Sequence, residues 1–203
     1  MKIGPKYKIA RRLGGAIFEK TQTQKFALRN EKKNFANNTG KRAKSNFALQ
    51  LLEKQKVKYT YGISTKQLSN YVKAILQSKQ KQPELGFFQS LEKRLDNVVL
   101  RSGLATTRFQ ARQMVTHGHM RVNNKKTTVP SYQIKKGDIV TVKDSSKIKP
   151  LFVGFKDKSK DVITPTWINV DPKNYTITIV ADPEYKPAEL AFSLGDVIQF
   201  YKR

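Results

Sequence analysis

The distribution of charge constrains this chain most, because its entire net charge falls in its first three quarters. The sequence carries 40 Lys and Arg against 15 Asp and Glu, a formal net charge of +25. Residues 1–150 hold 33 of the basic and 8 of the acidic side chains, whereas residues 151–203 hold 7 of each. Such an excess repels itself in a compact state unless a polyanion neutralises it. We therefore expect residues 1–150 to bind nucleic acid. An anionic membrane surface is the alternative, but no long amphipathic basic helix favours it.

Composition argues against several other classes of protein. The chain has no cysteine, which rules out disulfides and thiolate metal sites and permits a reducing compartment. It has no apolar run of about 18 residues, and its charged N-terminus lacks the apolar segment of a secretory signal. We find no phosphate-binding glycine loop and no paired carboxylates that would indicate an enzyme or a small-molecule substrate. His117 and His119 are the only histidines, and their spacing makes a poor metal site, so we expect no metal and no cofactor.

Residues 1–44 are predicted to form a basic N-terminal arm. Their basic side chains oppose only Glu19 and Glu31, and stretches rich in glycine and asparagine interrupt regular structure. One interpretation is a disordered tail. Aromatic residues such as Tyr7 and Phe26 interleave with the charges, however, and this pattern favours an arm that becomes ordered on RNA.

Residues 45–86 are predicted to form a small helical domain, packed with the C-terminal segment 188–203. Ser64 and Gln67 have the spacing of a capping box at the start of its second helix. Residues 83–86 have the composition of a turn or linker. The apolar segment 197–201 fits either a strand or a helix.

Residues 87–187 are predicted to place helices on a small, mainly antiparallel sheet. The first helix follows the apolar spacing from Phe88 and ends at Gly103, and the next begins at Thr107. Its expected apolar positions are Phe109, Ala111, Met114 and Val115. A period of two then predicts strands around an Asn123-Asn124 turn and over residues 139–142, and two further strands over residues 167–170 and 175–180. Trp167 is expected to be a packing anchor rather than a base-stacking residue. Residues 143–164 predict no firm element. The fold class is therefore α+β.

Arg101, Arg108 and Arg112 border the turn at Gly103, and the last two are one helical turn apart. A solvated helix face usually alternates the signs of its charges, yet no acidic residue lies between Asp96 and Asp138. This absence favours phosphate binding by the arginines over a plain solvated face.

Residues 92–142 closely resemble the S-four RNA-binding module. The matching positions are Arg94-Leu95-Asp96, Gly103, Arg108, Ala111-Arg112, Gly118, Val122-Asn123, Pro130 and Gly137-Asp138. Flanking segments resemble bacterial small-subunit ribosomal protein four along nearly the whole chain. These segments are residues 4–12, residues 53–58, Tyr61-Gly62, Asn70-Tyr71, residues 165–167 with 170–171, and residues 200–203. The resemblance implies a ribosomal protein of that family, in its cysteine-free branch without the zinc site that many members hold in the arm.

The resemblance also implies partners and sites. The family binds the 5′ domain of 16S ribosomal RNA at a junction of helices, early in subunit assembly. It lies beside small-subunit protein five, near the channel through which messenger RNA enters, and contributes to decoding accuracy. The implied location is a cytoplasmic ribosome, or that of an organelle. The expected RNA contacts are Lys2, Lys6, Lys8, Arg11, Arg12, Lys41, Arg42 and Lys44 in the arm, Lys54, Lys56, Lys58, Tyr61, Lys66 and Tyr71 in the helical domain, and Arg94, Arg101, Thr107, Arg108, Arg112, His117, His119, Lys125 and Lys126 in the module.

Two alternatives carry the same module. Arg94-Leu95-Asp96 superficially resembles the catalytic motif of pseudouridine synthases, but Lys93 replaces its glycine, and the residues after the module are too few for a catalytic domain. Asp96 is instead expected to cap a helix or to pair with an arginine. A free RNA-binding stress protein would lack the long flanking match.

Overall fold

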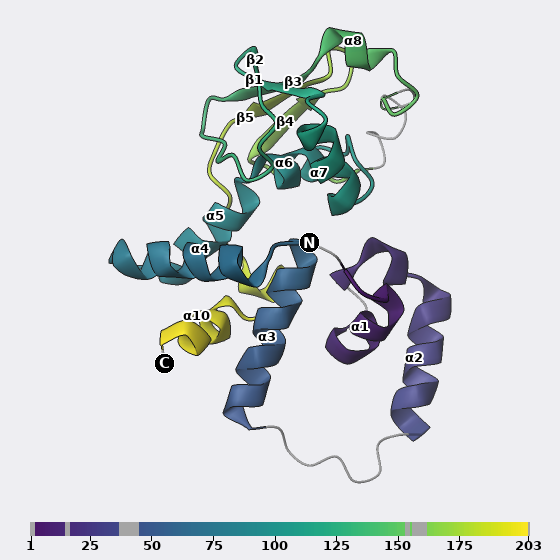
Figure 1. The fold of residues 1–203 in the computed structure, drawn as a ribbon, viewed down its shortest axis with the longest axis vertical. Coiled ribbons are helices and arrows are strands. Elements are labelled where there is room, and N and C mark those ends of the chain that lie inside the picture. The colour runs from purple at the N-terminus through teal and green to yellow at the C-terminus, as the bar shows by residue number, and fades with distance from the viewer. Residues whose placement is uncertain (1–2, 15–16, 37–44, 153–154, 156–161, 203) are drawn as a thin grey trace. The chain divides into compact units, whose positions relative to one another are not determined.

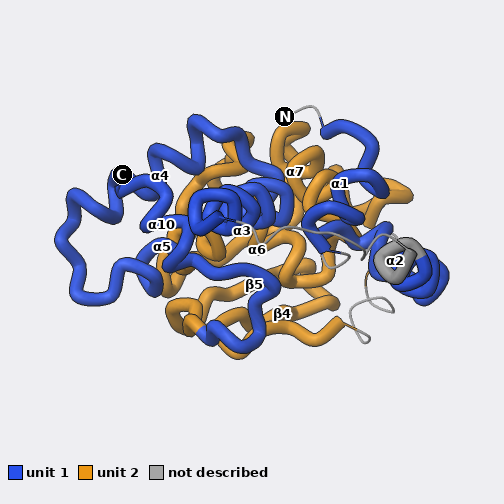
Figure 2. Tube along the Cα trace, turned by 90° about the horizontal axis from the view of Figure 1, so that it is seen from below, with its two compact units in different colours: residues 1–87, 186–203 blue, residues 88–185 orange. Residues whose placement is uncertain are grey.

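The computed structural model describes residues 3–14, 17–36, 45–152, 155 and 162–202. The chain divides into two compact units, which Figure 2 colours separately. Unit 1 comprises residues 1–87 and 186–203, and unit 2 comprises residues 88–185. Among the described residues, no helix is both long and apolar enough to cross a membrane.

The first part of unit 1 contains more regular structure than the arm prediction implied. It comprises α1 (Lys6–Leu13), the short 3-10 helix η2 (Glu19–Thr21) and α2 (Gln24–Ala36) (Figure 1). Gly14 follows α1 with φ of 118°, a conformation that favours glycine. Ala10, Leu13 and Phe18 are buried in a small apolar cluster, and the Phe18 ring packs edge-on against Tyr59. The interleaved apolar residues therefore form a core of their own.

The second part of unit 1 is built from α3 (Asn46–Thr60), α4 (Thr65–Gln77) and α10 (Leu194–Lys202). The predicted capping box is confirmed, because the Ser64 hydroxyl accepts from the Gln67 backbone N–H and the Gln67 amide oxygen accepts from the Ser64 N–H, both at 3.1 Å. The C-terminal segment is helical. It packs on α3, where the Phe200 ring lies 5.5 Å from the Phe47 ring. The 3-10 helix η4 (Pro187–Glu189) precedes it.

Two predictions between residues 83 and 103 were wrong. Residues 83–86 are not a turn but the start of α5 (Pro83–Glu92), because proline fits the first turn of a helix, where its missing N–H needs no partner. The predicted continuous helix is also broken, since α6 (Leu95–Arg101) begins after an extended Arg94. Hydrogen bonds from a distant loop hold this break, with Leu95 N–H donating to Tyr132 and Ile134 N–H donating to Lys93.

Unit 2 contains a five-stranded antiparallel sheet in the order β2-β1-β3-β5-β4 (Figure 1). Its strands are β1 (Met120–Val122), β2 (Lys125–Lys126), β3 (Ile139–Val142), β4 (Ile168–Asp171) and β5 (Thr176–Ile179). One face of the sheet packs with α6 and α7 (Arg108–Thr116) in an apolar core that includes Met114, Val140, Trp167 and Ile177. The α+β class and the packing role of Trp167 are confirmed.

Turn geometry in unit 2 follows the sequence closely. Asn123 and Asn124 have φ of 48° and 64°, the left-handed pair that a tight hairpin turn requires. Gly103 follows α6 with φ of 79°. Thr107 caps α7 by accepting from the Gln110 N–H, but the Gln110 side chain reaches Thr106 instead of completing a capping box.

The segment without a firm prediction holds the single-turn helix α8 (Asp144–Lys147). Beyond it, Phe152 and Phe155 are buried in the core of unit 2.

Candidate nucleic-acid interface

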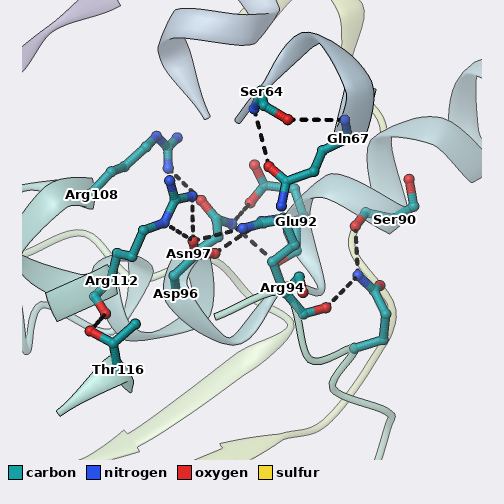
Figure 3. A network of polar contacts seen from close by, with 12 residues as sticks. Ser64, Gln67, Ser90, Glu92, Arg94, Asp96, Asn97, Arg108, Arg112 and Thr116 are labelled. Atoms are coloured by element: carbon teal, nitrogen blue, oxygen red, sulfur yellow. Dashed lines mark hydrogen bonds and ion pairs between the residues drawn. The ribbon is translucent and has the colours of Figure 1, made fainter. Parts of the chain in front are cut away.

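Four of the predicted RNA contacts in unit 2 are arginines that form hydrogen bonds with buried polar side chains. Figure 3 labels three of them, Arg94, Arg108 and Arg112, together with Glu92, Asp96 and Asn97. Asp96 accepts two hydrogen bonds from Arg94, at 3.0 and 2.8 Å, and two from Arg112, at 2.9 and 2.7 Å. Glu92 accepts two from Arg101, each at 3.0 Å. The expectation that Asp96 pairs with an arginine is confirmed.

The buried Asn97 side chain joins the fourth arginine to this network. Its amide nitrogen donates to a Glu92 carboxylate oxygen at 2.9 Å, and its amide oxygen accepts from Arg108. The network therefore fixes the guanidinium groups of α6 and α7 through hydrogen bonds to buried side chains. Such anchoring reduces the side-chain entropy that a long cation loses on binding. Counted over the described residues, the network holds four arginines against two carboxylates, an excess of positive charge.

Burial separates these arginines into two kinds. The Arg94 side chain is 2% exposed, so it is enclosed by protein and holds Asp96 in place. Its selection as an RNA contact is corrected for this reason. The Arg101 and Arg112 side chains are 37% and 25% exposed, and Arg108 is partly exposed. These three arginines reach solvent while their inner atoms are held.

The outer face of α7 was assigned wrongly in one respect. Phe109, expected in the core, is 66% exposed, while Ala111, Met114 and Val115 are buried as predicted. The apolar spacing of this short helix could not reveal that Phe109 lies opposite its buried side. Gln113 and Thr116 follow Phe109 at i+4 and i+7 and are exposed on the same face. Helix α7 itself carries no acidic residue, and an exposed aromatic ring among amide and hydroxyl groups is a surface on which RNA bases can stack.

His117 and His119 lie at the C-terminal end of α7. Their ring centroids are 6.1 Å apart, and His119 Nδ1 lies 2.9 Å from Ser146 Oγ. Burial, and then the positive charge of Lys149, lower the pKa of His119 below its ordinary value. Both rings border a shallow hollow of about 150 Å³. Within the described ranges, no three His, Asp or Glu side chains gather as metal ligands.

Thr107 and the hairpin lysines complete the predicted contacts of unit 2. The Thr107 hydroxyl is occupied as the cap of α7. Lys125 and Lys126 are exposed at the hairpin. Gly118, beside Lys126, has φ of 71°, a backbone conformation that favours glycine.

The predicted contacts on α3 and α4 fall into different environments. Tyr61 is only 3% exposed and packs edge-on against Phe192, so its selection as an RNA contact is corrected. Lys54 Nζ lies over the Phe200 ring, 4.1 Å from its centroid. Burial, followed by the charge of Lys58, lowers the pKa of Lys54.

The remaining predicted residues of unit 1 vary in exposure. Lys56 is ion-paired with Glu53 at 2.6 Å. Lys58 lies over the Tyr59 ring, while Lys66 is exposed and Tyr71 is partly buried. In the arm, Lys8, Arg11 and Arg12 are exposed and Lys6 lies over the Phe18 ring. Lys2, Lys41, Arg42 and Lys44 fall outside the described residues.

Comparisons with known proteins agree with this geometry. Residues 93–140 match the family model of the S4 domain, and residues 1–92 match that of the Ribosomal protein S4/S9 N-terminal domain. Together with the network of arginines, these matches define an RNA-binding ribosomal protein.

Relatives that align along almost the whole chain narrow the class. Small ribosomal subunit protein uS4 of Roseiflexus sp. (strain RS-1) is 37% identical over 98% of each chain. The uS4 protein of Aquifex aeolicus is 35% identical over 99% of this chain and 98% of its own. The chain belongs to the small ribosomal subunit protein uS4 family, whose members are structural and not enzymes. The resemblance to the ribosomal family is confirmed, and the pseudouridine synthase alternative is set aside.

Proposed function

We propose that this protein is a primary binder of the 16S ribosomal RNA 5′ domain. It would attach at a junction of RNA helices and nucleate assembly of the small subunit. The observation that supports this proposal is the set of solvent-reaching arginines on α6 and α7. Their guanidinium groups are held by hydrogen bonds to Glu92, Asp96 and Asn97. Guanidinium groups fixed in this way suit phosphates at fixed separations, which a folded junction presents and a flexible strand does not.

The network supports binding by shape more than reading of sequence. RNA duplexes expose phosphates and 2′-hydroxyls, whereas their deep major groove hides base edges from side chains. A protein that fixes several phosphates at once therefore also fixes the RNA helices that carry them. This is the physical basis on which we assign a role in assembly.

Further roles follow from the family and from the distribution of charge. We propose that the charge-balanced residues 151–203 contact small-subunit protein five. We also propose a position near the channel that admits messenger RNA, with an influence on decoding accuracy, in a cytoplasmic or organellar ribosome. We propose that these contacts with RNA and protein are shared among three domains: the arm (1–44), the helical domain (45–86 with 188–203) and the module (87–187).

Binding of the purified chain to 16S 5′-domain RNA, across a salt series and against excess bulk tRNA, tests the primary role. Tight binding that survives the competitor is expected. If excess tRNA abolished binding of the 5′-domain RNA, the positive charge would be acting without specificity. Arg108→Ala with Arg112→Ala should weaken binding and flatten its salt dependence by roughly one unit of slope per lost phosphate contact. Lys136→Ala, which removes an exposed cation of unit 2 outside the network, serves as the control.

A further inference from the structure

A second basic site lies in unit 1, between α1 and α2. It is a hollow of about 510 Å³, within the range of roughly 300–1,000 Å³ that is typical of small-ligand sites. Tyr7 and Arg11 line it from α1, one helical turn apart. Lys25, Phe26 and Arg29 line it from α2. Charged and aromatic side chains from two helices therefore converge on one space.

The charges in this hollow have one sign. Of the described residues that line it, Arg11, Lys25 and Arg29 are cations and none carries a carboxylate. Among the residues that the structure describes, none of these three forms an ion pair. Arg11 Nε donates to the Tyr7 backbone oxygen at 3.3 Å, which orients its guanidinium group. Three cations brought together without an acid repel one another, and a bound phosphate would reverse that repulsion.

The hollow also has an aromatic side. The Tyr7 and Phe26 ring centroids are 5.9 Å apart with a tilt of 38°, and Tyr7 is 44% exposed. Lys20 Nζ lies 5.7 Å from the Tyr7 ring centroid and adds a further positive charge. Aromatic side chains beside a cationic groove are the usual combination by which proteins hold unpaired nucleotides, with the base on a ring and the phosphate on the cations. A base in a duplex is stacked and paired, and so cannot reach such a ring.

We propose that the hollow between α1 and α2 binds one unpaired nucleotide of the ribosomal RNA. Arg29, with Arg11 and Lys25, holds its phosphate, and Tyr7 stacks on its base. The site rests on the proposed role as an RNA binder and adds to it a contact that requires a single-stranded nucleotide. In this chain, without cysteines in the arm, such a nucleotide would also tie α1 to α2.

Two probes separate this site from general attraction to charge. The full-length protein is titrated with a short single-stranded oligoadenylate and with a duplex that contains the same strand, each across a salt series. Tyr7→Leu keeps an apolar side chain but removes the ring. It should weaken single-strand binding about tenfold, the loss of one stacked base, with an unchanged salt slope and unchanged duplex binding. Tyr7→Phe should restore wild-type affinity.

A matched pair of charge variants tests the phosphate contact. Arg29→Gln should weaken single-strand binding and lower its salt slope by roughly 0.7. Lys32→Gln removes the same charge from an exposed position on the same helix that does not line the hollow, and should change affinity less than twofold. If Tyr7→Leu unfolds α1, which a loss of the helical circular dichroism signal would reveal, the comparison of Arg29→Gln with Lys32→Gln still tests the site.

The outcomes separate the two proposals. Equal losses for Arg29→Gln and Lys32→Gln, or equal effects of Tyr7→Leu on single strand and duplex, would overturn the nucleotide site. If the wild-type protein still bound 5′-domain RNA against tRNA, the proposed function would stand and only this site would fail. Failure of the wild-type protein in that assay would instead refute the proposed function.

Discussion

Asp96→Asn should destabilise unit 2 by about 3 kcal/mol, because it removes the carboxylate with which the buried Arg94 guanidinium is ion-paired. The Arg94 side chain is 2% exposed and the Asp96 side chain 6% exposed, so solvent cannot replace the lost carboxylate. Removing one partner of a buried ion pair costs about 3–5 kcal/mol. Asparagine keeps the size of the side chain and one acceptor oxygen, which places the expected effect at the lower end of that range.

Two further substitutions calibrate this value. Arg112→Gln removes the partner that is 25% exposed and leaves Arg94 paired with Asp96, so about 1 kcal/mol is expected. Asp182→Asn makes the same chemical change at a carboxylate 52% exposed, whose ion pair with Lys93 is screened by water. Its expected effect is about 0.5 kcal/mol. The double variant Asp96→Asn with Arg112→Gln should lose less than the sum of the single changes, since the two side chains share hydrogen bonds.

Tryptophan fluorescence provides the assay. Trp167 is the only tryptophan of the chain, it is 6% exposed, and it belongs to the core of unit 2. Urea unfolding followed at this residue therefore reports on unit 2 without requiring unit 1 to unfold with it. A loss for Asp96→Asn no larger than that for Arg112→Gln would refute the reasoning, because it would mean that Arg94 does not depend on this carboxylate.

Three other predictions follow from local geometry. Since burial lowers the pKa of His119 in the folded state, the stability that this group contributes to unit 2 should be fully present above the ordinary histidine pKa and should fall as the pH drops toward the folded pKa. His119→Gln should flatten this dependence in Trp167 unfolding. Lys54→Met keeps the apolar stem but removes the cation over the Phe200 ring, so hydrogen exchange in α10 should quicken, reflecting a loss of about 0.5–1 kcal/mol. Asn124→Gly should leave unit 2 as stable or slightly more so, whereas Asn123→Gly should destabilise it by about 1 kcal/mol, because the Asn123 side chain bonds to Asp138 and the Ile139 N–H. Equal urea midpoints for the two asparagine variants would contradict the last prediction.

Features that depend on neighbouring residues in the chain could be predicted from the sequence. The capping box at Ser64, the stop after α6 at Gly103 and the Asn123-Asn124 turn each require a particular residue at a particular backbone conformation. The S-four module was visible for the same reason, since it combines such signals in a fixed order. Charge distribution likewise needs no structure, and it indicated a nucleic-acid partner.

Features that depend on packing were beyond the sequence. Arg94 is buried although arginine is usually exposed, and Phe109 is exposed although phenylalanine is usually buried. Periodicity in a helix as short as α7 cannot fix which apolar residue faces the sheet, and the break between α5 and α6 depends on hydrogen bonds from residues about 40 positions away.

The division between sequence and tertiary structure has one physical origin. The sequence by itself determined the sign and location of the charge, the caps and turns, and the family, because these follow from residue types and their spacing. Only the tertiary structure decided which arginines reach solvent and which one is buried and holds Asp96 in place. It alone brought Tyr7 and Arg29 to one hollow. Burial and convergence arise when segments distant in the chain compete for the same core, and no local pattern records the result.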